Sequence, residues 1–246
     1  MSEIDDLRAQ VAQACRVLGK LDLTKAATGH VSARLPGSDR ILIRARGPGE
    51  LGVRYTTDDQ VIECGLDGKL ITAGANLSAP LEVFIHTEIY KARPEINAVV
   101  HIHPPTVVLF TICDLPLLPI YGSYDPPSLL LALQGVPTYH RSILIETPEL
   151  GEELVKAMGD APTCMMRGHG ITTAAESVYQ AALYAIHLND LAVMNYQARL
   201  LGTPRPISDA DQAVFRSSME IRTTGKGPFS GRAAALWRYY VELTGA

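Results

Sequence analysis

The stretch Ile96-Asn97-Ala98-Val99-Val100-His101-Ile102-His103-Pro104-Pro105 decides how the rest of the chain is organised. Its run of apolar, largely β-branched residues ends at a Pro pair, which predicts a short buried strand. Because side chains alternate across a strand, His101 and His103 are expected on one face, with Val100 and Ile102 on the other. A strand end is also where a chain opens into a cleft. Two imidazoles held side by side at such a rim indicate half of a metal site.

The composition is that of a globular protein, with 246 residues, 47% hydrophobic and 20% charged. This length suits one large domain, and we find no linker, low-complexity tract or repeat. We therefore predict a single domain over residues 1–246 that ends in a helical tail from about residue 205. The formal net charge of -4 argues against a nucleic-acid partner bound through its phosphates.

The N-terminus and the cysteines indicate a cytoplasmic protein. Residues 1–6 are acidic and lead into an amphipathic pattern, whereas a signal peptide needs basic residues followed by an apolar run. No stretch approaches the roughly 20 apolar residues of a membrane span, so no membrane partner is expected. The four cysteines are isolated in the sequence, which is typical of reduced thiols. They are Cys15, Cys64, Cys113 and Cys164.

The first 100 residues alternate between helical and hairpin patterns. Apolar spacing predicts a helix over residues 4–18, with Gly19 as its C-terminal stop. Two hairpins should follow, and the second turns at Asp67-Gly68. A helix is predicted over residues 80–92 with Pro80 in its first turn, and Glu82 and His86 share one face of it. The expected strands lie within residues 28–35, 41–46, 61–64 and 69–72.

Strands and helices remain interspersed in the second half, without strict βαβ alternation. The pattern predicts a mixed α/β layered fold. The expected elements are an irregular loop at 121–127, a helix at 148–158, a strand at 164–166, a tight turn at 167–170 and a long buried helix from about 174 to 201. A helix capped by Ser208 through Phe215, a Gly-rich segment from Thr224 to Gly231 and a last helix over 232–243 complete the chain.

A His-x-His strand needs a third ligand before it can be called a catalytic metal site. His169 is the best candidate because Gly168 and Gly170 beside it allow a close backbone approach. Three imidazoles leave coordination positions open, as catalytic sites do. The alternative is that these histidines serve only as hydrogen-bonded structural groups. His140 is expected to be exposed, and His187 is expected to be a packed residue of the long helix.

Glu82 would lie near the metal if its helix packs beside the His101 strand. Partial burial would raise the pKa of its carboxyl, which could then transfer protons near neutral pH. The alternative is a glutamate that merely stabilises the helix N-terminus through the dipole.

The combined spacing is more specific than any single residue. Glu82, His86, Tyr90, Arg93-Pro94, the Val99-Val100-His101-Ile102-His103 run and the later Gly168-His169-Gly170 closely resemble the class II aldolase/adducin family. The resemblance covers roughly residues 7–202. It implies a three-layer α/β/α fold with a central mixed, largely antiparallel sheet.

The same resemblance implies the site. His101, His103 and His169 would bind one divalent ion per subunit, Zn or Mn with Co or Fe as further options, and Glu82 would be the acid/base. It also implies a homotetramer with active sites at subunit interfaces, where aromatic residues of a neighbour complete the pocket.

Departures from the family pattern point to the chemistry. Sugar-phosphate aldolases of the family have Gly-Asn, a Ser-Gly turn and Ser-Ser where this chain has Gly29-His30, Ala45-Arg46-Gly47 and Pro80-Leu81. The loss of these phosphate-binding groups argues against a phosphorylated substrate. His30 and Arg46 could instead bind a carboxylate, Arg46 through its two-pronged guanidinium. The alternatives are a solvated edge strand for Arg44 and Arg46 and a turn-stabilising hydrogen bond for His30.

The pattern therefore resembles the decarboxylase branch of the family, whose members act on hydroxylated aromatic or heteroaromatic acids. We predict a metal-dependent carbon–carbon lyase that decarboxylates an ortho-hydroxylated aromatic acid, with the metal as electron sink and Glu82 as proton donor. One alternative is an aldolase for a non-phosphorylated hydroxy-oxo acid or sugar, and another is an adducin-like interaction module without activity. Further substrate contacts are predicted from Ser78, Tyr121 and Tyr124.

Overall fold

The computed structural model describes residues 2–72, 76–223 and 230–246, with side chains outside residues 218–232. Its centre is one sheet of strands β1 (His30–Arg34), β2 (Arg40–Arg44), β3 (Val61–Gly65), β4 (Leu70–Thr72), β5 (Ala98–Ile102), β6 (Thr138–Tyr139), β7 (Thr163–Met166) and β8 (Gly170–Ala175). Their order is β4-β3-β2-β1-β5-β8-β7-β6. All neighbours pair antiparallel except β6 and β7, which are parallel.

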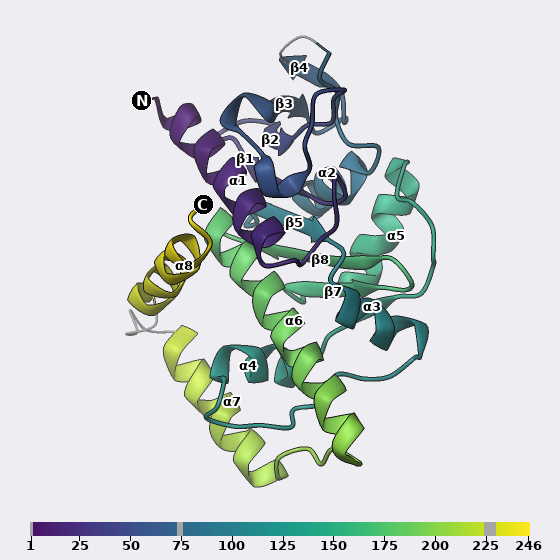
Figure 1. Cartoon of the computed structure of the whole chain (residues 1–246), viewed down its shortest axis with the longest axis vertical. Coiled ribbons are helices and arrows are strands. Elements are labelled where there is room, and N and C mark those ends of the chain that lie inside the picture. Colours follow the sequence, from purple (N-terminus) through teal and green to yellow (C-terminus); the bar gives the residue numbers. More distant parts are fainter. Residues whose placement is uncertain (1, 73–75, 224–229) are drawn as a thin grey trace.

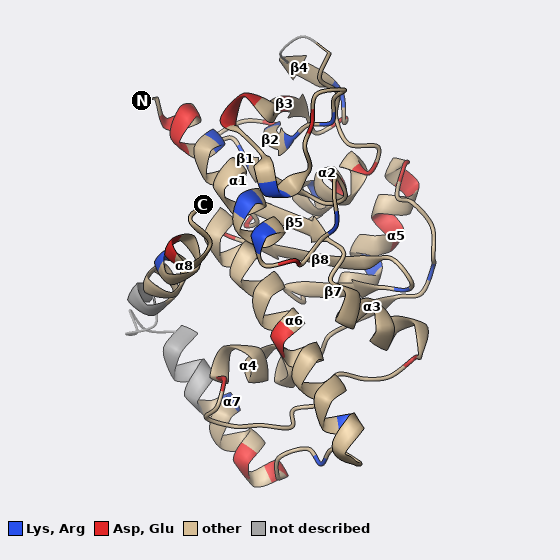
Figure 2. Ribbon diagram, in the orientation of Figure 1, with Lys and Arg blue, Asp and Glu red and all other residues tan. Residues whose placement is uncertain are grey.

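Helices cover both faces of this sheet (Figure 1). They are α1 (Glu3–Lys20), α2 (Val83–Ala92), α3 (Pro105–Ile112), α4 (Pro126–Gln134), α5 (Pro148–Met158), α6 (Val178–Leu201), α7 (Asp209–Thr223) and α8 (Ser230–Thr244), with short 3-10 turns at Val53–Tyr55 and Asp58–Gln60. Acidic residues occupy the first turns of α1 and α7 (Figure 2), where they stabilise the helix dipole. Among the described residues, no helix is long and apolar enough to cross a membrane.

Two hydrophobic cores lie on opposite faces of the sheet. Val100 and Ile102 of β5 pack in the first core with α1, α3 and α6. Val99 of the same strand packs in the second core with α2 and α5. The alternation predicted for this strand is therefore confirmed, and His101 shares the α2/α5 face with Val99. Together the sheet and its two helical layers confirm the predicted three-layer α/β/α fold.

The predicted start of the long helix at residue 174 is wrong. Gly170–Ala175 is instead strand β8, which pairs with β5 on one side and β7 on the other. The helix begins at Val178, after Ser177 in an extended conformation. Alanine favours helices, and Ala174 and Ala175 read as helical for that reason. Pairing on both edges overrides this local preference, because it satisfies the backbone groups of a fully buried segment.

Gly19 does not stop the first helix, which continues to Lys20. A Cβ at Gly19 would lie 2.6 Å from the backbone nitrogen of Arg54, so the glycine lets the 3-10 turn at Val53–Tyr55 approach α1. The other predicted hairpins and helices form, although α7 extends beyond Phe215 and α3 and α4 were not predicted. Of the Gly-rich segment predicted from Thr224 to Gly231, residues 224–229 lie outside the described residues.

All four cysteines are unpaired, as predicted. Cys15, Cys64 and Cys164 are buried in the two cores, and Cys113 is exposed at the end of α3.

Candidate metal centre and active site

Strand pairing fixes the first two histidines. In the sheet register His101 lies opposite His30 of β1 and Thr172 of β8, at the middle of the sheet. His101 is fully buried, while His103, just beyond the end of β5, is partly exposed. His103 lines a cleft, whereas His101 is buried beside it, with the two ring centroids 4.9 Å apart.

The turn between β7 and β8 brings His169 to the same place. Gly170 makes this possible, because a Cβ there would lie 2.6 Å from the His103 ring and closer still to the Ile102 carbonyl. The ring centroid of His169 is 4.9 Å from that of His101 and 5.0 Å from that of His103. A glycine is therefore required where the hairpin crosses the end of β5.

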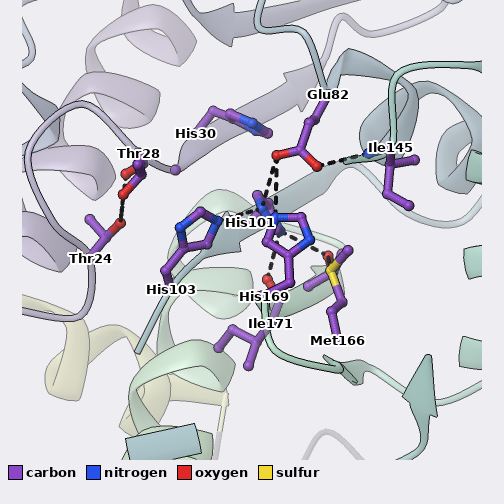
Figure 3. A network of polar contacts seen from close by, with 12 residues as sticks. Thr24, Thr28, His30, Glu82, His101, His103, Ile145, Met166, His169 and Ile171 are labelled. Carbon is purple, nitrogen blue, oxygen red and sulfur yellow. Dashed lines mark hydrogen bonds and ion pairs between the residues drawn. The ribbon is translucent and has the colours of Figure 1, made fainter. Parts of the chain in front are cut away.

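Glu82 completes a compact group of donor atoms (Figure 3). Its Oε2 lies 3.6 Å from Nε2 of His101 and 3.4 Å from Nε2 of His169. The Nε2 atoms of His101 and His103 are 2.9 Å apart. Two ligands bound to one tetrahedral Zn²⁺ at about 2.0 Å lie about 3.3 Å from each other. The spacing of these side chains fits a shared divalent ion.

The hydrogen bonding of the histidines supports the same interpretation. Nδ1 of His101 lies 3.0 Å from the carbonyl oxygen of Ile171, so Nδ1 carries the proton and Nε2 has a free lone pair. Both ring nitrogens of His169 are buried without a hydrogen-bond partner among the described residues. Buried polar atoms without partners are costly, and a bound metal ion would satisfy Nε2 of His169. The residues present therefore fit a divalent metal.

The imidazoles of His101 and His103 are neutral at physiological pH. Burial lowers the pKa of His103 to about 3, assisted by the neighbouring His101 and His169. Burial also lowers the pKa of His101. Neutral imidazole is the form that binds a metal, so these two ligands need not lose a proton before they bind an ion.

The pKa of the Glu82 carboxyl is lowered, whereas the sequence led us to expect a raised one. Burial raises its pKa, but the ring nitrogens of His101 and His169 beside the carboxylate lower it more, so the pKa lies well below its usual range. The side chain makes no cap hydrogen bond to α2, and its Oε1 accepts one of 2.9 Å from the backbone nitrogen of Ile145. Glu82 is therefore an ionised carboxylate that faces the histidines instead of capping the helix.

A cleft opens in front of these groups. Glu82, His103, His30 and Arg46 line it together with apolar Pro80, Leu81 and Leu144. The Arg46 side chain is half exposed, with Nε 3.9 Å from Glu50. Its guanidinium is therefore available to an anion in the cleft.

The predicted substrate contact Ser78 pairs with Arg46 through its backbone. Reciprocal hydrogen bonds of 2.9 Å join the Arg46 and Ser78 backbones, so Ser78 holds the segment that carries Arg46. The cleft-lining residues do not include Ser78 itself.

Arg44 is not on a solvated edge strand, because β2 lies between β1 and β3. It is almost fully buried, with Nη2 2.5 Å from Glu50 and Nη1 3.1 Å from the carbonyl of Ala27. Arg44 thus fixes the segment before β1 and also lines the floor of the cleft.

The structure does not bring Tyr121 and Tyr124 to the histidines of the same chain. Their rings contact each other, with centroids 5.6 Å apart, at the N-terminal side of α4. Asp125 follows them and caps α4. Nearby on α6 lies His187, which is buried as predicted, while His140 is exposed as predicted.

The structure also contains a buried series of hydrogen-bonded side chains that the sequence did not predict. Nδ1 of His30 lies 2.6 Å from Nε2 of His86, whose Nδ1 lies 2.6 Å from Oγ of Ser32. Ser32 Oγ in turn lies 2.8 Å from the Tyr90 hydroxyl. His30 therefore bonds a helix residue instead of stabilising a turn. The period-two spacing of His30 and Ser32 on one strand, with His86 and Tyr90 one turn apart on a helix, is the signal that could have revealed the series.

Comparison with known proteins agrees with this geometry. Residues 9–196 match the Class II Aldolase and Adducin N-terminal domain. This chain belongs to that family. It is 41% identical over 236 residues to the 3,4-dihydroxyphthalate decarboxylase of Arthrobacter keyseri, covering 94% of this chain and 91% of that protein. It is 42% identical to the enzyme of the same name from Rhodococcus jostii (strain RHA1), covering 85% of this chain and 88% of that protein.

Solved structures share the fold at lower identity. An aldolase II superfamily protein from Pseudomonas syringae superposes with a TM-score of 0.84 at 22% identity, covering 99% of this chain and 94% of that one. An L-fuculose 1-phosphate aldolase from Glaciozyma antarctica PI12 gives a TM-score of 0.80 at 19% identity, covering 98% and 90%. At these identities the similarity shows a common fold.

Proposed function

We propose that this protein is a divalent-metal-dependent decarboxylase of an ortho-hydroxylated aromatic dicarboxylic acid of the 3,4-dihydroxyphthalate type. The observation that carries the proposal is the group of Glu82, His101, His103 and His169, whose donor atoms converge beside a cleft that is also lined by Arg46 and His30. The 41% identity to a 3,4-dihydroxyphthalate decarboxylase over nearly the whole chain supports this substrate class.

His101, His103 and His169 would hold the ion, Zn or Mn. A bound divalent ion supplies Lewis acidity, which stabilises the electron pair left on the ring when the carbon–carbon bond breaks. The Nδ1–H of His101 bonded to the Ile171 carbonyl keeps that ring in the tautomer that offers Nε2.

Glu82 would move the proton. Because its pKa is lowered, the carboxylate enters the reaction ionised and must accept a proton before it can donate one. The phenolic hydroxyl beside the departing carboxylate is a suitable source. As the carbon–carbon bond breaks, CO2 leaves, the electron pair stays on the ring carbon, and Glu82 returns the proton to that carbon. The hydrogen bond from Ile145 holds the carboxylate in place throughout.

Arg46 and His30 would bind the carboxylate that the substrate retains. Both line the cleft beside Glu82 and His103, and the half-exposed guanidinium can form two parallel hydrogen bonds to a carboxylate. Fixing the ring in this way aligns the departing carboxylate with the metal centre.

We also propose a homotetramer whose neighbouring subunits complete the cleft. The cleft is rimmed by Leu81, which is 57% exposed, and Leu144, which is 51% exposed. Apolar side chains at the mouth of a polar site suit contact with another subunit better than contact with water. Tyr121 and Tyr124 are then candidates to reach the site of a neighbour. Native mass spectrometry of the purified protein tests the assembly, and a monomer would contradict it.

The test of function is metal analysis followed by turnover. The protein loaded with Zn or Mn is incubated with 3,4-dihydroxyphthalate, and CO2 release and the monocarboxylate product are measured. Stoichiometric metal with CO2 formation is the expected result. Cleavage of a hydroxy-oxo acid to an aldehyde without CO2 would favour the aldolase instead. A protein that binds no metal and turns over neither substrate would favour the adducin-like interaction module.

A further inference from the structure

The buried series that begins at His30 ends deep in the core. Ser32 and His86 are fully buried, and Tyr90 is 1% exposed. Three short hydrogen bonds, of 2.6, 2.6 and 2.8 Å, join His30 to His86, His86 to Ser32 and Ser32 to Tyr90. Both nitrogens of His86 are used, so one must donate and the other must accept. If Ser32 accepted from both His86 and Tyr90, its own buried proton would have no acceptor, so the series has one of two directions. Each direction fixes the tautomer of His30.

In the first direction each proton points toward the cleft. The Tyr90 hydroxyl donates to Ser32, Ser32 donates to Nδ1 of His86, and Nε2 of His86 donates to Nδ1 of His30. His30 then carries its own proton on Nε2. In the opposite direction His30 carries its proton on Nδ1, and Tyr90 receives a hydrogen bond from Ser32.

Two observations select the direction toward the cleft. In the opposite direction the Tyr90 hydroxyl proton would need another acceptor, and the described side chains offer it only Ser32. A buried donor without an acceptor costs about 1–3 kcal/mol. In addition, the guanidinium carbon of Arg34 lies 4.9 Å from the centre of the Tyr90 ring. A positive charge over a phenol withdraws electron density and makes its hydroxyl a stronger donor.

We infer that Ser32, His86 and Tyr90 are positioning residues that hold His30 in its Nε2–H tautomer, so that it presents a hydrogen-bond donor to the retained carboxylate of the substrate. Nε2 of His30 has no partner among the described residues, and the side chain lines the cleft. That the acceptor is a substrate carboxylate rests on the proposed function. The tautomer of His30 does not depend on it.

Nuclear magnetic resonance tests the tautomer without substrate. Long-range nitrogen–proton correlation of the full-length, zinc-loaded protein with ¹⁵N-labelled histidine distinguishes Nε2–H from Nδ1–H imidazole. The His30 signals are identified by their loss in His30→Asn. We expect the Nε2–H form in the wild type. An Nδ1–H form of His30 would overturn the inference, whatever the enzyme turns over.

A matched pair of variants tests the consequence for binding. His86→Leu removes the donor to His30, whereas the side-chain amide of His86→Gln can still provide it. Since a hydrogen bond to a charged group contributes about 1.5–3 kcal/mol, His86→Leu should raise KM for the dicarboxylate about tenfold or more. His86→Gln should restore most of that loss, and metal content should remain stoichiometric in both.

The substrate comparison separates positioning from general damage. With an ortho-hydroxy monocarboxylate, which lacks the retained carboxylate, KM should change less than about threefold in His86→Leu. Equal increases for both substrates would overturn the inference. If His86→Leu does not fold, Ser32→Ala breaks the next bond and replaces it in the same assay. A wild type with the Nε2–H tautomer but no decarboxylation would refute the proposed function and leave the positioning role standing.

Discussion

Two groups of metal-ligand residues in the described part of the chain have opposite electrostatics. Glu82, His101, His103 and His169 form one, and Asp125, His187 and Asp190 form the other, each with donor atoms within 4.8 Å of one another. The pKa of Glu82 is lowered by its histidines despite burial. Asp190 is exposed, yet partial desolvation of its carboxyl and the negative charge of Asp125 raise its pKa to about 6. The donor atoms are thus equally close in both groups. The negative charge of Glu82 is stabilised by its neighbours, whereas that of Asp190 is not.

The other side-chain contacts explain the difference. Asp125 is used as the cap of α4 and accepts hydrogen bonds from the backbone and hydroxyl of Ser128. Nδ1 of His187 lies 3.5 Å from the same hydroxyl. In the first group, by contrast, neither ring nitrogen of His169 has a hydrogen-bond partner within the described part of the chain. Ligand-type residues indicate a metal site when their donor atoms converge and are not used elsewhere.

The largest effect is expected from removing a ligand. His103→Ala should abolish stoichiometric metal binding and lower turnover at least a thousandfold, because two imidazoles cannot hold the ion in place. His187→Ala, the matched control from the other group, should keep its metal. Metal analysis after gel filtration measures both. Full metal content in His103→Ala would refute the assignment, and metal loss in His187→Ala would move the site to the second group.

Glu82→Gln should lower kcat by about 10²–10⁴, the usual contribution of a positioned acid/base. The metal should remain bound, because the three histidines are unchanged. Steady-state kinetics with metal analysis on the same sample checks both parts. Unchanged kcat would remove Glu82 from proton transfer, and loss of the metal would make it mainly a ligand.

Arg46→Ala should raise KM for an aromatic dicarboxylate about tenfold or more, because a charge-assisted hydrogen bond to a carboxylate is lost. The KM of the corresponding monocarboxylate should change much less. Arg167→Ala is the control, since Arg167 pairs with Asp114 on the surface, outside the cleft. Similar KM increases for both substrates would contradict the role of Arg46 in binding the retained carboxylate.

The smallest effect concerns stability at the second group. The raised pKa of Asp190 means that its ionisation disfavours the folded state as pH rises from about 4 through about 6. Asp190→Asn should therefore raise Tm at pH 7.5 relative to the wild type and give little gain at pH 4. Thermal unfolding at both values, in the presence of a chelator, measures the difference. A loss of stability at pH 7.5 would instead indicate that the Asp190 carboxylate is compensated, for example by a bound cation.

The sequence predicted well what depends on local pattern. Strand alternation placed His101 and His103 on one face, and the layered fold followed from the distribution of apolar residues. Flanking glycines selected His169, because Gly170 allows the close crossing of β5 and Gly168 adopts a positive φ in the turn. Strand β8 was missed, since its alanines have no strand preference and only pairing with β5 and β7 holds them extended.

By itself, then, the sequence determined the residue types, their periodicity and the family resemblance, which are properties of short segments and their spacing. The tertiary structure decided the ionisation of Glu82 and buried Arg44 beside Glu50. It alone joined Ser32, His86 and Tyr90 to His30. A pKa and a hydrogen-bond direction depend on burial and on partners distant in the chain, which become neighbours only when sheet and helices pack.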